Sequence, residues 1–283
     1  MTNYYLLLIQ LLFALIGLFL FWQGIGYFRR IWQYKKLKSI PFPQAYENIL
    51  QNIEHYTLLS PTYKEKIHLL ILSFIENKEF IQAKITINEK IKVIIAFYAS
   101  LMRLGFDFGE KDEVSSIIVY PKHFIVNHTD TLGGINHSEP LILEGQSANG
   151  TVVISWQNIE DEIARTEKEN VIIHEFAHEL DFEDGFADGT PVLEGSNYRS
   201  WSNVFSNVFD TLRTEVKKEK ISRNIAFLGL YALKNEAEFF AVCSERFFQA
   251  PKTLKKFFPD IYEELRRFYR LDSAVIFKDL SES

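Results

Sequence analysis

Cysteine is almost absent from this chain, which contains Cys243 alone among its 283 residues. A disulfide within the chain is therefore impossible, which fits a reducing compartment, and a structural metal site rich in cysteine is excluded. Internal repeats are absent as well, and the one low-complexity stretch is an apolar run near the N-terminus. Hydrophobic residues make up 47% of the chain, which is enough for a sizeable core.

Charge is absent from residues 1–28, so the chain lacks the basic start of a cleaved signal peptide. Within this stretch, residues 4–22 form an apolar run long enough to cross a bilayer as a helix. The run is longer than a signal peptide needs, and residues 21–24 make a poor cleavage site. The sequence therefore predicts an uncleaved membrane anchor, with Trp22 and Tyr27 at the membrane interface.

A basic cluster follows the apolar run at once, and its members are Arg29, Arg30, Lys35, Lys36 and Lys38. Positive charge beside a membrane helix stays in the cytoplasm, so we expect the N-terminus outside and the body of the protein inside. The same cluster suits anionic lipid headgroups. Because the net charge is −6 in spite of this cluster, the rest of the chain is acidic, which argues against nucleic-acid binding.

The remainder of the chain is expected to fold as α+β, with a small sheet against a central helix and helices before and after. Ser60-Pro61 is a helix start, and Thr86-Ile-Asn-Glu89 has the form of a capping box. Strands are predicted at 116–120, 139–144 and 151–156, and later helices at 165–182, 201–220, 235–249 and 254–271. The predicted segments are an anchor (1–28), a basic juxtamembrane linker (29–45), a helical part (46–113) and a mixed part (114–283).

The central helix contains His174-Glu175-x-x-His178. In a helix these two imidazoles lie one turn apart on the same face, where they can bind one metal ion. Imidazole nitrogen suits Zn²⁺, and three protein ligands leave a fourth position open for water. Glu175 lies where it can take a proton from that water. An ordinary amphipathic helix with two histidines is the alternative, but the apolar neighbours predict burial, and buried histidines need partners.

The other histidines are weaker candidates for metal ligands. His55 and His68 are expected in the helical part as core or surface residues. His123, His128 and His137 fall in predicted loops, and no two of them have helical i,i+4 spacing.

The third ligand is not fixed by spacing. Asp184 lies six residues after His178, where some zinc proteases place a ligand beyond a glycine turn, but Asp181 occupies the position of that glycine. Asp181 itself suits an acceptor that orients a ligand imidazole.

A later stretch offers three more carboxylates, Glu236, Glu238 and Glu245. Asn235 and Glu238 also form an N-x-x-E pair, which helix capping alone would explain. Which of these carboxylates reaches the histidines depends on how the chain folds, so sequence spacing does not decide among them.

Several dispersed motifs together resemble the Mlc titration factor A family of bacterial zinc peptidases, over about residues 63–269. They are His174-Glu-Phe-Ala-His-Glu-Leu-Asp181, Asp184-Gly followed by Asp188-Gly-Thr-Pro191, Asn235-Glu-Ala-Glu-Phe-Phe-Ala241, Val119-Tyr-Pro121 and Val153-Ile-Ser-Trp156. The pattern Tyr-x6-Glu-Phe-Phe-Ala is also similar to the zinc domain of anthrax lethal factor.

The resemblance implies a zincin-like fold of the gluzincin type, with one Zn²⁺ per chain and Glu238 as the third ligand. It also implies that Tyr231 faces the active site, where a phenol could stabilise an oxyanion; a core tyrosine is the alternative. Two departures stand out. The anchor is not part of the soluble family pattern, and Val242 occupies the position of the aspartate in the Glu-x-x-x-Asp of thermolysin-like enzymes.

The expected function is peptide-bond hydrolysis by a zinc peptidase, an aminopeptidase being one form, at the bacterial inner (cytoplasmic) membrane with the catalytic part in the cytoplasm. The strand at 151–156 is expected to pair with an extended peptide substrate. One alternative is a membrane-tethered protein that sequesters a transcriptional regulator, as the family name implies. A purely structural zinc site is a second alternative, disfavoured by the lack of cysteine.

Overall fold

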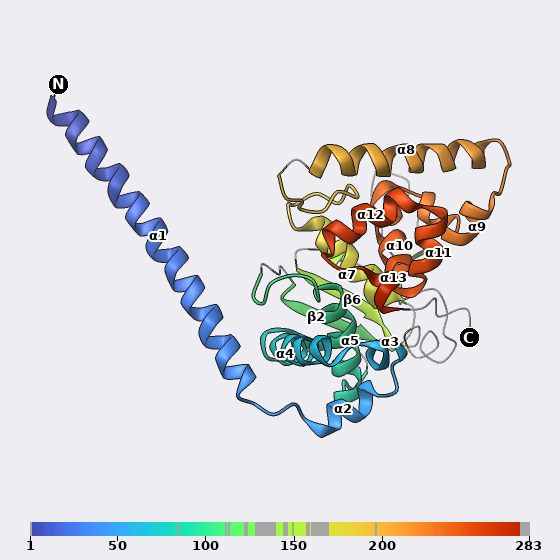
Figure 1. The fold of residues 1–283 in the computed structure, drawn as a ribbon, viewed down its shortest axis with the longest axis horizontal. Helices are drawn as coiled ribbons and strands as arrows, with labels where there is room; N and C mark the ends of the chain where they lie inside the picture. The colour runs from blue at the N-terminus through green and yellow to red at the C-terminus, as the bar shows by residue number, and fades with distance from the viewer. Residues whose placement is uncertain are drawn as a thin grey trace.

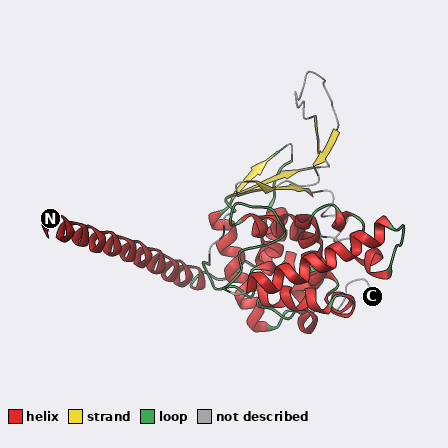
Figure 2. Ribbon diagram, turned by 90° about the horizontal axis from the view of Figure 1, so that it is seen from above, coloured by secondary structure: helices red, strands yellow, loops and turns green. Residues whose placement is uncertain are grey.

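The computed structural model describes residues 2–83, 85–110, 112, 114–121, 124–127, 140–143, 147–148, 150–156, 159, 170–195 and 197–277. A long N-terminal helix, α1 (Thr2–Lys38), projects from a body made of helices and a small sheet (Figure 1). Viewed from above, the strands lie along one side of the helices (Figure 2).

Helix α1 is long and apolar enough to cross a membrane, a finding that rests on the length and composition of Gln10–Lys38. The basic residues predicted to lie in a linker are part of this helix, because no proline interrupts it before Pro41. The last turns of α1 contact the body. Leu37 is buried, Tyr34 packs edge-on against Phe108 with ring centroids 5.4 Å apart, and Lys36 pairs with Glu76.

Four helices form the first part of the body: α2 (Gln44–Leu50), α3 (Glu54–Leu58), α4 (Pro61–Asn77) and α5 (Glu89–Met102). Helix α4 starts at Pro61 behind Ser60, as the sequence predicts. The predicted cap of α5 is wrong, because Asn88 rather than Thr86 precedes the helix and its Oδ1 accepts from Ile91 N at 2.9 Å. Asn is at least as good a cap as Thr, and it lies two residues nearer the buried run.

The main sheet has the strand order β1-β2-β6-β5, with β1 (Glu79–Gln82), β2 (Ser116–Tyr120), β6 (Thr151–Ser155) and β5 (Ser147–Ala148). Strands β1, β2 and β6 are parallel and β5 is antiparallel. Ile117 pairs with Val152 and Val119 with Ile154, and all four are buried. A separate antiparallel pair joins β3 (Phe124–Asn127) and β4 (Pro140–Leu143). Strand β1 falls in the part that the sequence predicts as helical.

Helices build the rest of the body: α7 (Val171–Phe182), α8 (Asn197–Lys217), α9 (Arg223–Leu228), the 3₁₀ turn η1 (Tyr231–Leu233), α10 (Glu236–Gln249), α11 (Pro251–Phe257), α12 (Pro259–Phe268) and α13 (Ser273–Ile276). The central helix begins at Val171, later than predicted, because Asn170 is extended and caps it. Residues 165–169, where the start was predicted, lie outside the described part of the chain.

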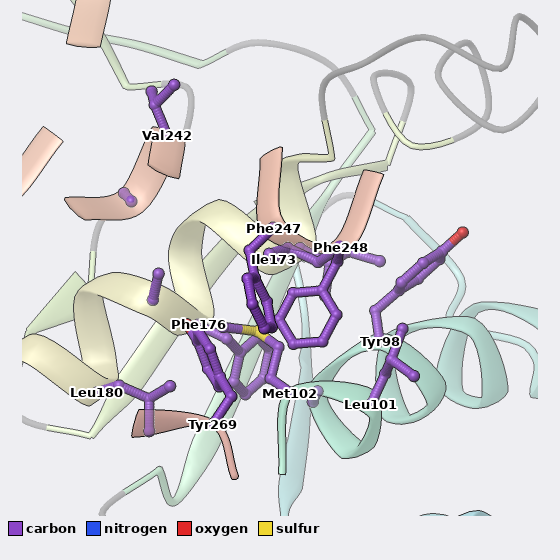
Figure 3. Packing of buried hydrophobic residues seen from close by; sticks show 14 of the residues in the cluster. Tyr98, Leu101, Met102, Ile173, Phe176, Leu180, Val242, Phe247, Phe248 and Tyr269 are labelled. Carbon is purple, nitrogen blue, oxygen red and sulfur yellow. The ribbon is translucent and has the colours of Figure 1, made fainter. Parts of the chain in front are cut away.

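The core lies where α5, α7 and α10 meet. Figure 3 shows Met102 of α5 and Phe176 of α7 beside Phe247 and Phe248 of α10, with Tyr269 packed against them. The rings of Phe247 and Tyr269 are stacked at 5.4 Å between centroids. The described residues thus form a mostly helical α+β body with a small, largely parallel sheet, which confirms the α+β class predicted from the sequence.

Candidate metal centre

Three side chains from two helices converge on one point. His174 and His178 lie on α7, Glu238 lies on α10, and one ligand atom from each falls within 4.8 Å of the others. Nε2 of His174 lies 3.1 Å from Nε2 of His178 and 3.1 Å from Oε2 of Glu238, and Nε2 of His178 lies 3.4 Å from that oxygen. Atoms about 2.0–2.1 Å from a tetrahedral Zn²⁺ are separated by roughly 3.3 Å, so this donor set fits the ion in spacing and in chemistry.

Helix α7 places the two histidines by its own geometry. Asn170 fixes its start, since Asn170 Oδ1 accepts from Ile173 N at 3.1 Å. The spacing of four residues then puts both imidazoles on one face. The remaining face is apolar and buried through Ile172, Ile173, Phe176, Ala177 and Leu180. Packing of that face holds the helix, and with it the histidine pair, against the core.

Helix α10 supplies the carboxylate. Asn235 caps the helix, and its Oδ1 accepts from Glu238 N at 2.8 Å. The return half of a capping box would turn Glu238 toward Asn235, but its carboxylate is directed to the histidines instead. Tyr231 Oη donates to Glu238 Oε1 at 2.9 Å, and Lys234 Nζ lies 3.5 Å from the same oxygen. The capping interpretation therefore explains Asn235 and not Glu238.

The electrostatics of the cluster favour a cation. Burial raises the pKa of Glu238, but hydrogen bonds from His174 and His178 outweigh it and hold that pKa well below its usual range. Burial lowers the pKa of His174, but hydrogen bonds with Glu238 and Glu245 raise it to about 10. Both shifts show that the carboxylates around His174 stabilise positive charge, and a metal cation bound there would take the place of the imidazole proton.

Glu245 orients the first histidine, a residue that spacing alone did not single out. Its Oε1 lies 2.7 Å from His174 Nδ1, and its Oε2 accepts from Asn170 N at 3.1 Å. The structure therefore gives this role to Glu245 rather than to Asp181, which accepts from Gly189 N at 2.9 Å. The sequence did contain one indication of this role. Glu245 follows Glu238 by seven residues and so lies on the same face of the helix, two turns later.

The competing third ligands do not join the group formed by His174, His178 and Glu238. Asp184 is exposed, and its Oδ1 accepts from Phe186 N at 3.0 Å within its own loop. Glu236 is exposed at the start of α10. Glu245 is close to the histidines, but it contacts His174 through Nδ1, on the opposite side of the ring from Nε2.

The histidines outside α7 have other surroundings. His55 is buried, and its Nε2 lies 3.0 Å from Phe248 O. His68 stacks on Phe42 and lies 2.7 Å from Tyr56 Oη. His123, His128 and His137 lie outside the described residues.

Glu175 and Tyr231, the two residues expected to act in catalysis, both lie near the cluster. Glu175 is buried on α7 between the ligand histidines, and its charge contributes to the raised pKa of His174. Tyr231 is 49% exposed, with its ring centroid 6.0 Å from that of His174. Its hydroxyl is thus held at the rim of the cluster by Glu238, on a side that solvent reaches.

A buried His-Glu-x-x-His helix completed by a glutamate from a second helix defines a metallopeptidase-type centre. Comparison with known proteins gives the family. The chain belongs to the glucose-regulated metallo-peptidase M90 family, whose model matches residues 28–270. This confirms the resemblance found in the sequence, since the relatives below include proteins with the name used there.

Mlc titration factor A of Pectobacterium atrosepticum is 32% identical over 237 residues, covering 79% of this chain and 88% of that protein. Mlc titration factor A of Yersinia pestis is 29% identical over 249 residues, covering 86% and 89%. An uncharacterized protein of Synechocystis is 29% identical over 251 residues, covering 86% and 90%. The similarity therefore extends over most of each chain and includes the helical first part of the body.

Proposed function

We propose that this chain is a zinc-dependent peptidase with a zincin-like fold of the gluzincin type. The observation that carries the proposal is the convergence of His174, His178 and Glu238 at separations that fit Zn²⁺. A zinc ion held by these three residues supplies Lewis acidity and makes a water molecule acidic.

Glu175 serves as the general base in this proposal. It adjoins His174 on α7 and is buried, so its carboxylate is shielded from competing solvent. It takes the proton from the attacking water and passes it to the leaving amine. Glu245 accepts from Nδ1 of His174, which leaves Nε2 of that ring as the ligand atom.

Tyr231 serves as the oxyanion donor. Its hydroxyl is already within hydrogen-bond distance of a ligand carboxylate, and about half of the residue is exposed to solvent. A phenol in this position can donate to the oxygen that becomes negative as the carbonyl is attacked. Substitution by Phe keeps the ring and removes the donor, so it isolates this contribution.

Strand β6 is the proposed docking edge for an extended peptide. One edge of β6 pairs with β2, and on the other edge the described residues of β5 pair with Thr151 and Val152. In this proposal an extended substrate adds to the strand at 151–156 through backbone hydrogen bonds. Proline removes a backbone donor, so prolines beside the scissile bond should abolish cleavage, and indifference to them would count against this mode. Aminopeptidase action is one form of this activity, distinguished by a requirement for a free N-terminus.

Helix α1 is proposed to anchor the protein in the bacterial inner membrane, as a single span. Its apolar side chains are exposed, and its basic residues lie at the end that joins the body. This charge asymmetry supports a cytoplasmic body. Proteolysis of sealed spheroplasts tests the orientation, because a body protected from external protease supports it and a digested body does not.

A second candidate function is sequestration of a transcriptional regulator, with catalysis incidental. It is favoured by the name of two relatives, Mlc titration factor A. Capture of a partner by a chain stripped of zinc separates this function from peptidase activity.

The deciding experiment is peptide hydrolysis by the full-length protein in detergent, wild type against Glu175→Gln, with the zinc content of both measured. The substitution keeps the size of the side chain and removes the base. Activity that is lost in the variant while zinc is retained supports the peptidase. Zinc bound in both with no hydrolysis by the wild type shifts the weight to sequestration.

A further inference from the structure

In the loop that follows helix α7, Gly189 contacts three helices, α7, α8 and α10. Gly189 contacts Asp181 of α7, the backbone of Glu236 at the start of α10, and Trp201 of α8. We call Gly189 with these three contacts the Gly189 joint. Two of these helices, α7 and α10, carry the three residues of the candidate metal centre.

The first contact ties the loop to α7. Asp181 Oδ2 accepts from Gly189 N at 2.9 Å. Asp181 is fully buried and lies three residues after His178 on the same helix. Burial raises the pKa of Asp181 to about 7, although the amides of Gly189 and Thr190 act to lower it. Burial is unfavourable for a carboxyl, but the Asp181 carboxyl provides the acceptor that binds the loop amide of Gly189. A shorter apolar side chain would have no acceptor for this amide.

The second contact brings the loop against α10 without a side chain between them. Gly189 has φ +79°, a conformation that favours glycine. A Cβ at this position would lie 2.5 Å from Glu236 O and 2.8 Å from Glu236 C. The backbone of Gly189 therefore rests directly on the first turn of α10, two residues before Glu238.

The third contact fixes the remaining polar group of Gly189. Trp201 Nε1 donates to Gly189 O at 3.0 Å, and Trp201 is buried and stacked on Phe205 at 4.1 Å between centroids. The amide and the carbonyl of one glycine are thus bonded to two different helices, while its Cα touches a third.

The joint lies at one end of the helix pair, and Glu245 lies at the other. Glu245, near the end of α10, contacts His174 and Asn170 at the start of α7. Gly189 connects the end of α7 with the start of α10. The two helices therefore run in opposite directions, and the three candidate ligands lie between two fixed connections.

We propose that Asp181 and Gly189 are positioning residues, which set the distance between α7 and α10 and so bring Glu238 within reach of the ion held by His174 and His178. The inference rests on the proposed zinc site. A ligand set must be held to about 0.5 Å, so loss of either connection is expected to weaken metal binding before it unfolds the body.

The test is zinc affinity, measured on the full-length protein in detergent by competition with a chromogenic chelator, with the melting temperature measured alongside. Asp181→Ala removes the acceptor and should lower zinc affinity about 10- to 100-fold, the range found for groups that support a metal ligand. Asp181→Asn keeps an acceptor oxygen of the same reach and should stay within about threefold of the wild type. Gly189→Ala should lower affinity at least as far as Asp181→Ala, because its Cβ separates the helices.

A matched control is a substitution that lowers the stability of the body and lies outside the Gly189 joint. Ile67 is fully buried in α4, so Ile67→Ala should lower the melting temperature and leave zinc affinity unchanged. Wild-type affinity in Asp181→Ala would overturn the inference. An equal loss of affinity in Ile67→Ala would also overturn it, as would an equal loss in Asp181→Asn.

Trp201→Phe decides the case if Asp181→Ala does not fold. It keeps an aromatic ring beside Phe205 and removes only the N–H that bonds Gly189 O. A severalfold loss of zinc affinity supports the joint, and unchanged affinity overturns it. A wild-type chain that binds no zinc overturns the proposed function itself, which is a different result from a zinc-binding wild type whose joint variants bind equally well.

Discussion

Helices α1 and α10 are both rich in phenylalanine, and they have opposite surroundings. From Ala237 to Gln249 every residue of α10 is buried. In α1, Phe19 is 62% exposed and Trp22 is 73% exposed. Apolar content alone therefore does not distinguish the core helix α10 from the proposed membrane helix α1, because a membrane helix would bury its surface in lipid as a core helix does in protein.

The two helices differ in the polar groups that they contain. Helix α10 contains Glu238, Ser244, Glu245 and Arg246 inside the protein, and hydrogen bonds from other elements reach each of them. Helix α1 carries no charge before Arg29, as expected of the proposed membrane span, because lipid offers no partner for a charge. The comparison suggests that charge kept inside an apolar helix marks the site of chemistry, and the following experiments test that view.

Removing the ligand carboxylate should have the largest effect. Glu238→Ala leaves two neutral imidazoles as ligands, and zinc affinity should fall more than about 100-fold, beyond the loss usual for residues that only support a ligand. Equilibrium dialysis with zinc buffers measures it. Retention of stoichiometric zinc at nanomolar free metal would show that another residue completes the site.

Truncating one phenylalanine in each helix tests the two surroundings directly. Phe247→Ala opens a cavity in the core and should cost about 3–5 kcal/mol of unfolding free energy. Phe19→Ala should leave the unfolding of the body unchanged, because Phe19 contacts lipid in the proposed arrangement. Urea unfolding in detergent compares them, and equal losses would mean that α1 is part of the folded core.

Removing the group behind His174 should have an intermediate effect. Glu245→Gln leaves an amide beside Nδ1 in place of a charged acceptor, and zinc affinity should fall about 10- to 100-fold. Glu264→Gln is the matched control, because Glu264 is also buried and pairs with Arg267 at 2.9 Å on α12. A loss of the same size in the control would show that any buried charge has this effect.

The last prediction concerns pH. The pKa of Asp181 is raised to about 7, so the folded protein holds a proton that the unfolded chain releases near pH 4. This contribution to stability is full below pH 4 and is lost as pH rises through 7, by at most about 1.4 kcal/mol per pH unit. The unfolding free energy of wild type relative to Asp181→Asn should therefore fall between pH 5 and pH 7. A difference that stays constant over this interval would show that the carboxyl is already ionised in the folded state.

Local signals in the sequence predicted the parts of the site that depend on one helix. The spacing of His174 and His178 required only that α7 be helical, and the apolar pattern around them predicted its buried face. Asn235 was recognised as a cap for the same reason. Its partner Glu238 was selected from the resemblance, because the turn of its carboxylate toward α7 depends on how two helices pack.

Contacts between helices explain what the sequence did not reveal. Glu245 was only one of several candidate carboxylates, and its approach to His174 depends on the packing of α10 against α7. Asp181 looked like a partner for histidine, but the loop that returns at Gly189 takes its carboxylate. The start of α7 and the cap of α5 were misplaced because Asn170 and Asn88 are better caps than the polar residues before them.

The docking of α1 has a mechanical consequence. Its last turns are held by Leu37 in the body, by Tyr34 on Phe108 and by Lys36 on Glu76, before the chain turns at Ser39. A helix fixed in this way acts as a rigid stalk and not as a flexible tether. With α1 in a bilayer, the body would keep a constant distance and tilt relative to the membrane. The metal centre would then reach only substrates within a thin layer beside the membrane, whereas a flexible tether would let it reach a larger volume.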